Sequence, residues 1–360
     1  MDTWERPAPE LAQPPRPNVA GMGMTALGTL VAGLGESGFR AAQIYQGLYQ
    51  QRWSSWEQFS NLSKALRAKL EAATELRWPE LYETVGSDDG SSKHAFRLED
   101  GSLIEGVHMP YADRTTLCLS SQVGCAMGCT FCATGLMGIK RNLTPGEIAG
   151  QVVAMLNAHG HPASAPVNLV FMGMGEPLHN LDNVMAAFAL LTDPKAMGLS
   201  PKRITLSTSG LVNGIRRLAT YPRRPRLALS LNATTDEYRS SIMPVNRAWN
   251  LAALAEALKA FPLEHGERIT REYVLLKGVT DSLEDGRRLA AFALQFPSKV
   301  NFIPFNAHEG SGFEAPLETR IGELCALLTA RGLTASVRRS RGQDVAGACG
   351  QLVRGANPAL

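Results

Sequence analysis

From Thr115 onward, short apolar stretches alternate with longer amphipathic stretches that have helical periodicity. This alternation is typical of a parallel α/β sheet or barrel, because each strand must return to the sheet through a crossover helix. Strands are expected at residues 115–120, 167–171, 203–207, 226–231, 271–276 and 300–304. Six units are fewer than the eight that close a full barrel, so the sequence predicts an α/β fold with a partial (β/α)6 barrel and a wide mouth.

One helix start is well marked in the sequence. Thr144 supplies an N-cap, Pro145 occupies the first helical position, and Glu147 stands where a reciprocal capping acid is expected. We therefore expect the first crossover helix of the barrel to begin at Pro145.

The run CAMGCTFC places Cys125, Cys129 and Cys132 in a C-x3-C-x2-C spacing after the first expected strand. Each thiolate can bind one iron of a cubane cluster, and no fourth cysteine stands beside them to bind the last iron. The spacing resembles the radical-SAM signature. That resemblance implies a [4Fe–4S] cluster whose open iron holds S-adenosylmethionine, from which one electron releases a 5′-deoxyadenosyl radical.

Two other uses of clustered cysteines are open at this point. The three thiolates and a distant histidine such as His159 would also suit structural zinc, although zinc fingers usually bring their ligands in two close pairs. Disulfide bonds fit less well, because the cysteines are clustered and the sequence shows no secretory signal.

Polar and small residues stand where the expected strands end. Glycine lets a backbone approach a ligand, and the carboxylate of Glu176 in the run GMGEP can receive an ammonium group. Hydroxyl, amide and exposed backbone groups at the other strand ends can bind a carboxylate, a ribose or adenine, although each alone is also a common turn or cap residue. The candidates are Gly175, Glu176, Ser207, Ser230, Leu231, Asn232 and Asn306.

The 360 residues are long enough for one large α/β domain with additions. No apolar run reaches the length of a membrane span. Before the barrel, the helical spacing of leucines and the strand-like run HAFRLEDGSLIEGVHM predict two smaller units. The expected division is a disordered, proline-rich leader (1–23), a helical accessory domain suited to RNA binding (24–90), a β-hairpin connection (91–114), the partial barrel (115–310) and a C-terminal extension that carries Cys349 (311–360).

The net charge is only +3, so the distribution of charge is more informative than its total. A run without acidic residues extends from Lys202 to Arg226, and a second group of arginines lies near Cys349. Such patches suit phosphate backbones, and we expect them around the barrel mouth, although a solvated arginine surface explains each residue singly as well. The residues are Lys202, Arg203, Arg216, Arg217, Arg223, Arg224 and Arg226, and later Arg331, Arg338, Arg339 and Arg341.

Several linked runs resemble the RlmN family of adenine-C2 methyltransferases far more specifically than the cysteine triplet does. They are SSQVGCAMGCTFCATGLMG, RNLTPGEI, FMGMGEPLHN, ITLSTSG, MPVNR and ACGQL, in that order. The resemblance implies cluster ligation by Cys125, Cys129 and Cys132. It also implies that the seven strand-end candidates bind S-adenosylmethionine. Asn232 stands where the family often has histidine, which leaves its contact open.

The resemblance also assigns roles to two further cysteines and one carboxylate. It implies that Cys349 receives a methyl group from a first S-adenosylmethionine, that a radical from a second activates this methyl group, and that the carbon adds to adenine. Cys118 would resolve the adduct through a transient disulfide with Cys349, and Glu105 would accept the C2 proton. Without the resemblance, Glu105 would be taken for a surface carboxylate and Cys349 for a small buried apolar residue.

The implied partners are 23S rRNA, tRNA and a flavodoxin-type electron donor, and we expect a cytoplasmic monomer without a membrane segment. Three alternatives remain. A Cfr-type enzyme would use the same cysteines to methylate adenine C8, an iron–sulfur redox sensor would bind RNA without modifying it, and a zinc-stabilised module would only bind nucleic acid.

Overall fold

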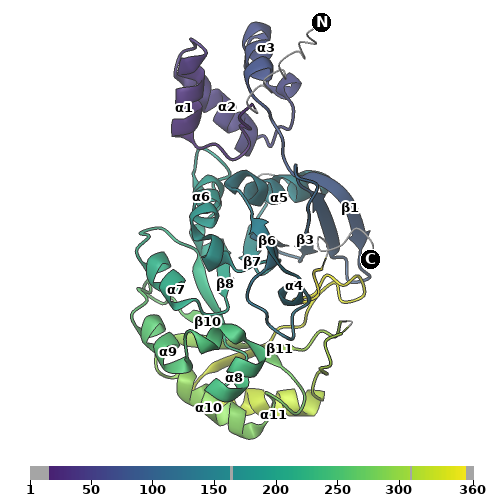
Figure 1. Ribbon diagram of the computed structural model, residues 1–360, viewed down its shortest axis with the longest axis vertical. Coiled ribbons are helices and arrows are strands. Elements are labelled where there is room, and N and C mark those ends of the chain that lie inside the picture. The colour runs from purple at the N-terminus through teal and green to yellow at the C-terminus, as the bar shows by residue number, and fades with distance from the viewer. Residues whose placement is uncertain (1–15, 163–164, 309, 354–360) are drawn as a thin grey trace, which may run out of the picture.

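The computed structural model describes residues 16–162, 165–308 and 310–353, and its core is a ten-stranded sheet (Figure 1). The strand order is β1-β2-β3-β4-β7-β8-β9-β10-β11-β12, and β5 and β6 form a separate two-stranded sheet. The strands are β1 (Glu80–Gly86), β2 (Ser92–Arg97), β3 (Leu103–Pro110), β4 (Thr115–Cys118), β5 (Gln122–Cys125), β6 (Gly138–Asn142), β7 (Val167–Phe171), β8 (Ile204–Thr208), β9 (Arg226–Ser230), β10 (Ile269–Leu275), β11 (Ser298–Pro304) and β12 (Thr334–Val337).

The parallel part of this sheet contains the six strands expected from the sequence, which are β4 and β7 to β11. Register is continuous across it, with Cys118 beside Val170 and Thr205 beside Arg226. Alternate residues of these strands, such as Leu169, Leu206 and Leu229, are fully buried, since both faces of the parallel strands are covered. The ladder runs from β1 to β12 without closing on itself, so the prediction of a partial barrel is confirmed.

Helices cover the outside of the parallel strands in Figure 1, with α5 packed on α6, α7 on α9, and α10 on α11. The helix α5 begins at Pro145 as expected, because the Thr144 hydroxyl accepts the Glu147 N–H and the Glu147 carboxylate accepts the Thr144 N–H. The helices are α1 (Met24–Gly33), α2 (Phe39–Tyr49), α3 (Lys64–Ala73), α4 (Ala133–Leu136), α5 (Pro145–Ala158), α6 (Leu181–Thr192), α7 (Val212–Ala219), α8 (Asp236–Ile242), α9 (Leu251–Lys259), α10 (Leu283–Ala293) and α11 (Glu318–Thr329). Among the described residues, no helix has the length and apolar character needed to cross a bilayer.

The helices α1, α2 and α3 form a small unit at one end of the molecule (Figure 1). Leu27, Ile44 and Leu70 are fully buried in it, as their helical spacing predicts. Residues 16–23, assigned to the expected leader, belong to this packed structure: Val19 is fully buried and its N–H donates to Glu75 O at 2.8 Å. The remainder of that leader, residues 1–15, lies outside the described residues.

Two strands at the edges of the sheet were not expected. The strand β1 pairs antiparallel with β2, within the range assigned to the helical domain, and most of its residues are exposed. An exposed edge strand carries no alternating apolar pattern, so the sequence did not indicate it. After α11, β12 pairs parallel with β11 and extends the barrel beyond residue 310.

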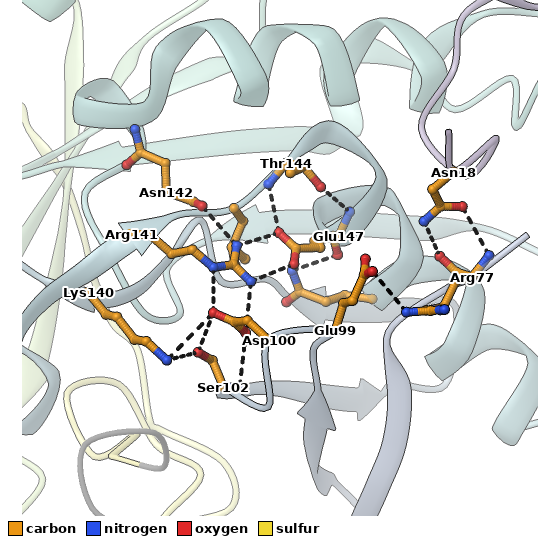
Figure 2. A network of polar contacts seen from close by, with 12 residues as sticks. Asn18, Arg77, Glu99, Asp100, Ser102, Lys140, Arg141, Asn142, Thr144 and Glu147 are labelled. Atoms are coloured by element: carbon orange, nitrogen blue, oxygen red, sulfur yellow. Dashed lines mark hydrogen bonds and ion pairs between the residues drawn. The ribbon is translucent and has the colours of Figure 1, made fainter. Parts of the chain in front are cut away.

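A network of charged and polar side chains joins the helical unit, the β2–β3 turn and the start of α5 (Figure 2). Arg141 on β6 donates to Asp100 at 2.9 Å and to Glu147 at 2.8 Å, and Arg77 pairs with Glu99 at 3.0 Å. The side chain of Asn18 bonds both the N–H and the carbonyl of Arg77. These contacts hold the paired strands β5 and β6 against the rest of the molecule, and Cys125 is the last residue of β5.

Candidate active site at the carboxyl ends of the strands

A cavity of about 160 Å³ lies at the carboxyl ends of the parallel strands. This is the edge at which the sequence places the candidate residues, because parallel strands all end on the same side of a sheet. Ten of the predicted residues line it, namely Cys125, Cys129, Cys132, Gly175, Glu176, Ser207, Ser230, Asn232, Asn306 and Cys349.

The cysteine triplet lies on the loop between β5 and α4. Cys125 and Cys129 are buried, and Cys132 is partly buried. Burial raises the pKa of Cys125 to about 12, and it raises the pKa of Cys129 and of Cys132 as well. Each thiolate also opposes ionisation of its neighbours, so the three become thiolates together only when a cationic metal centre compensates their charge.

Among the described residues, no group of three His, Cys, Asp or Glu side chains is arranged to hold a single metal ion. Three thiols on one loop around a shared cavity do suit a cluster that offers each of them a separate iron.

The turn after β7 brings backbone close to the cysteine strand. Gly175 has φ +101°, and a Cβ on it would lie 2.6 Å from Cβ of Gln122, so only glycine fits there. The fully buried Gln122 accepts the N–H of Glu176 at 2.8 Å and donates to Asn142 at 2.7 Å. Its side chain thus connects the Glu176 turn with β5 and β6.

Glu176 is buried, with 3% of its surface exposed. Its carboxylate accepts the N–H of Ser209 at 2.7 Å, the Ser209 hydroxyl at 2.8 Å and the Leu178 N–H at 3.0 Å. Burial nevertheless raises the pKa of Glu176 from its ordinary value. A cationic group entering the cavity would favour the charged carboxylate, so the position suits an ammonium ligand.

The next two strand ends contribute small polar groups. The hydroxyls of Ser207 and Ser230 lie 3.2 Å apart at the cavity wall. Asn232 adopts φ +58°, and its side-chain oxygen accepts the Val274 N–H at 3.0 Å. Leu231 is fully buried and is not part of the cavity lining, so the structure does not place its side chain toward a ligand.

Asn306 holds the loop that carries Cys349. Its amide donates to the Cys349 carbonyl at 3.0 Å and to the Ser340 hydroxyl at 2.9 Å, while its oxygen accepts from Gln343 at 2.8 Å. On the other side, the Gly350 carbonyl accepts the Ala133 N–H at 2.7 Å, directly after the cluster loop. Cys349 is therefore fixed between the end of β11 and the cluster loop.

Cys118, the last residue of β4, lies in a second, narrow cavity of about 30 Å³. Cys349 lines this cavity as well as the larger one, so it stands at their junction. The described cysteines, Cys118 and Cys349 included, are all free thiols. Burial and, to a smaller extent, the nearby Cys349 raise the pKa of Cys118 to about 12.

Glu105 is fully buried on β3 and lines neither cavity. Lys93 lies 3.3 Å from its carboxylate, which also accepts the Val353 N–H at 2.9 Å. The segment that follows Cys349 thus covers Glu105.

Sequence reasoning did not single out two charged residues of the cavity wall. Glu272 on β10 is 4% exposed, burial raises its pKa, and its carboxylate lies 4.0 Å from Arg338. A carboxylate inside the apolar strand Ile269–Leu275 was the available signal. Arg338 had been noted only as one member of a basic group.

The basic run from Lys202 to Arg226 does not lie at the barrel mouth, which corrects our expectation. Lys202 and Arg203 immediately precede β8, and Arg226 is the first residue of β9. These positions lie at the amino ends of parallel strands, opposite the cavity. Arg223 and Arg224 donate there to the backbone carbonyls of Thr192 and Tyr221.

Comparison with known proteins agrees with this site. Residues 119–290 match the radical SAM superfamily, and residues 17–76 match the ribosomal RNA large subunit methyltransferase N-terminal domain. A dual-specificity RNA methyltransferase RlmN from Anaeromyxobacter sp. (strain Fw109-5) is 48% identical over 98% of this chain and 93% of its own length. The chain belongs to the RlmN family.

Other relatives and a solved structure agree with this assignment. RlmN 2 from Myxococcus xanthus is 47% identical over 96% of the chain and 93% of its own length. The crystal structure of a radical SAM methyltransferase from Sphaerobacter thermophilus has a TM-score of 0.90 and 41% identity, over 93% of this chain and 99% of that one. The cofactors of this family member are a [4Fe–4S] cluster and S-adenosylmethionine, and the thiol triplet facing Glu176 across one cavity fits them.

Proposed function

We propose that the protein methylates C2 of a specific adenosine in 23S rRNA and of the adenosine 3′ of the anticodon in tRNA. As an RlmN family member the chain is a radical-SAM RNA methyltransferase. The position of Cys349, which borders both the cavity of the cysteine triplet and the narrow cavity of Cys118, supports a route through a methylated cysteine. The similarity to RlmN enzymes favours C2 over C8.

Adenine C2 lies between two ring nitrogens and is poor in electrons, so it does not attack a sulfonium methyl group as a nucleophile would. The bound cluster and S-adenosylmethionine supply a methyl group and, from a second S-adenosylmethionine, a carbon radical that abstracts hydrogen. Cys349 receives the methyl group on its sulfur and, after hydrogen abstraction, presents it as a carbon radical that can add to C2.

Three strand-end side chains would bind S-adenosylmethionine. Glu176 would receive its ammonium group, and Ser207 and Ser230 would donate to its polar atoms. Gly175, Asn232 and Asn306 complete the proposed set, with Asn232 and Asn306 acting mainly through the backbone that they hold. Leu231 would contribute only through its backbone.

Addition leaves the protein joined to RNA through the Cys349 sulfur. Addition of a carbon radical leaves an unpaired electron on the adduct, which would return to the bound cluster as Glu105 accepts the C2 proton. This step requires the segment around Val353 to move away from Glu105. The Cys118 thiolate would then attack the Cys349 sulfur and release methyladenine, leaving a Cys118–Cys349 disulfide for reduction.

The proposed reaction requires a reducing compartment and a source of electrons. An oxygen-sensitive cluster and a disulfide that must be reduced in every cycle suit the bacterial cytoplasm. A flavodoxin-type protein would supply the electrons, and the protein would act as a monomer.

The test is a product analysis with anaerobically reconstituted protein and unmodified 23S rRNA fragments and tRNA. After nuclease digestion, mass spectrometry should find 2-methyladenosine from both substrates. The isomer 8-methyladenosine as the main product would instead identify a Cfr-type enzyme, and RNA binding without any methylation would indicate a binding protein.

RNA binding should depend on charges at the mouth and not on those at the amino ends of the strands. Arg339 lines the narrow cavity with a side chain that is 71% exposed, whereas Arg226 lies at the opposite end of the sheet. Arg339→Glu should lower the slope of log affinity against log salt by about 0.7, the value for one phosphate contact on single-stranded RNA. The matched change Arg226→Glu should leave the slope unchanged; a larger effect of Arg226→Glu would place RNA on the other face.

A further inference from the structure

The apolar surroundings of Cys118 oppose the ionisation that its proposed role as a nucleophile requires. Only 6% of its surface is exposed, and the apolar side chains Val107, Met109 and Met172 line its cavity. With a pKa raised by burial to about 12, nearly all of this thiol is protonated near neutral pH. Since a thiolate and not a thiol attacks a sulfur atom, the site must contain a group that favours the ionised form.

Arg338 is a charged residue that lines both the cavity of Cys349 and the narrow cavity that Cys349 shares with Cys118. Arg338 directly follows β12, and its backbone N–H donates to Phe302 O at 2.8 Å, which holds it to the end of β11. Its Nη1 lies 2.9 Å from the sulfur of Met172, a neighbour of Cys118 in the narrow cavity. Arg338 lines both cavities, and Cys349 is the largest cause that raises its pKa.

The other charged groups around this cavity point elsewhere. Arg339 pairs with Glu318 at 3.0 Å, and Arg341 lies over the ring of Tyr111 and pairs with Asp89. On β3, Glu105 contacts Lys93 and Val353. Glu272 lies 4.0 Å from Nη1 of Arg338, the same nitrogen that contacts the sulfur of Met172.

We propose that Arg338 is the cation that stabilises the Cys118 thiolate in the step that releases RNA, and that Glu272 holds its guanidinium in place. This inference rests on the proposed function and deepens it. Arg338 already lowers the pKa of Cys118 against the dominant effect of burial.

Stabilisation of the Cys118 thiolate by Arg338 should be largest in the protein–RNA adduct, where the thiolate must attack. In the free enzyme, a negative charge on the Cys349 sulfur opposes ionisation of Cys118. In the adduct, the Cys349 sulfur is a thioether that carries no charge, so this opposition disappears while the charge of Arg338 remains.

The step balances without a further oxidant. The Cys118 thiolate forms a bond with the Cys349 sulfur as the bond between this sulfur and the methylene carbon breaks. The bonding pair leaves with the carbon, which takes one proton from solvent and becomes the methyl group. Both sulfur atoms are oxidised to the disulfide while the carbon is reduced, and a dithiol reductant restores the thiols afterwards.

To test this role, the variants Arg338→Met and Arg338→Lys and the control Arg331→Met are expressed as full-length protein. Arg331 is an exposed arginine before β12, at the opposite end of the sheet from the cavities. Arg338→Met should keep the cluster spectrum and S-methylation of Cys349, yet accumulate a covalent protein–RNA species. Arg338→Lys should accumulate less, because an ammonium supplies the same charge, and Arg331→Met should accumulate none.

A second measurement does not depend on RNA or turnover. In a Cys349→Ala background, modification of Cys118 by methyl methanethiosulfonate is followed against pH by peptide mass spectrometry. Without Arg338 the thiol pKa rises, so the pH profile should move upward by about one to two units in Arg338→Met, and the adduct should resolve faster at higher pH.

The outcomes separate this inference from the proposed function. An unshifted profile, or an Arg338→Met enzyme that resolves its adduct at the normal rate, would overturn the role of Arg338. If the profile shifts but the unsubstituted protein never methylates Cys349 or RNA, then Arg338 affects the thiol as inferred while the proposed function fails.

Discussion

Replacing Cys118 with alanine is expected to leave the protein covalently attached to RNA through Cys349. The substitution removes the nucleophile that breaks the bond between the Cys349 sulfur and the methylene carbon, while the steps that form this bond remain. Turnover should fall by at least about a thousand-fold, as expected when a residue that forms a covalent bond in the reaction is removed. Denaturing gel electrophoresis and mass spectrometry after expression in cells should show the nuclease-sensitive adduct.

Cys349→Ala should fail in a different way. It should retain its cluster but acquire no methyl group and no RNA, because it lacks the sulfur that carries the carbon. Cys325→Ala is the matched control, since this partly buried cysteine on α11 lies outside both cavities. A Cys118→Ala protein with methylated Cys349 and no adduct would show that another group resolves the intermediate.

Replacing any one of Cys125, Cys129 or Cys132 with alanine should abolish the [4Fe–4S] cluster and the reductive cleavage of S-adenosylmethionine. Each thiolate binds a different iron, so no ligand is redundant. Losing a residue that only hydrogen-bonds to a metal ligand lowers metal affinity by up to about a hundred-fold. Losing a ligand itself should cost more, so we expect the affinity for the cluster to fall by at least about a hundred-fold. Iron and sulfide analysis, with the visible spectrum of anaerobically reconstituted protein, measures the amount of bound cluster.

Cys325→Ala again provides the control and should bind iron normally. Formation of 5′-deoxyadenosine after chemical reduction measures the cleavage of S-adenosylmethionine independently of RNA. A full cluster in all three variants would remove the triplet from cluster binding and would require other ligands.

The sequence by itself determined the six parallel strands β4 and β7 to β11, the capped helix and the residue types of the site. Most residues of the parallel strands β4 and β7 to β11 are buried, so their apolar runs stand out from the polar segments between them. The Thr144 cap depends only on residues three apart, and the cysteine spacing lies within one loop. These features depend on residues that are close together in the sequence, so the sequence pattern is enough to predict them.

Only the tertiary structure decided which distant residues meet. Cys118 and Cys349 are brought to one narrow cavity by the pairing of β4 with β7 and by the Asn306 contacts of the last loop. The structure also shows that Arg338 lines both cavities, that Glu272 lines the larger one, and that the basic run lies at the opposite end of the sheet. Charge and sequence spacing do not specify the end of a strand at which a side chain acts, because that depends on the direction in which the chain enters the sheet.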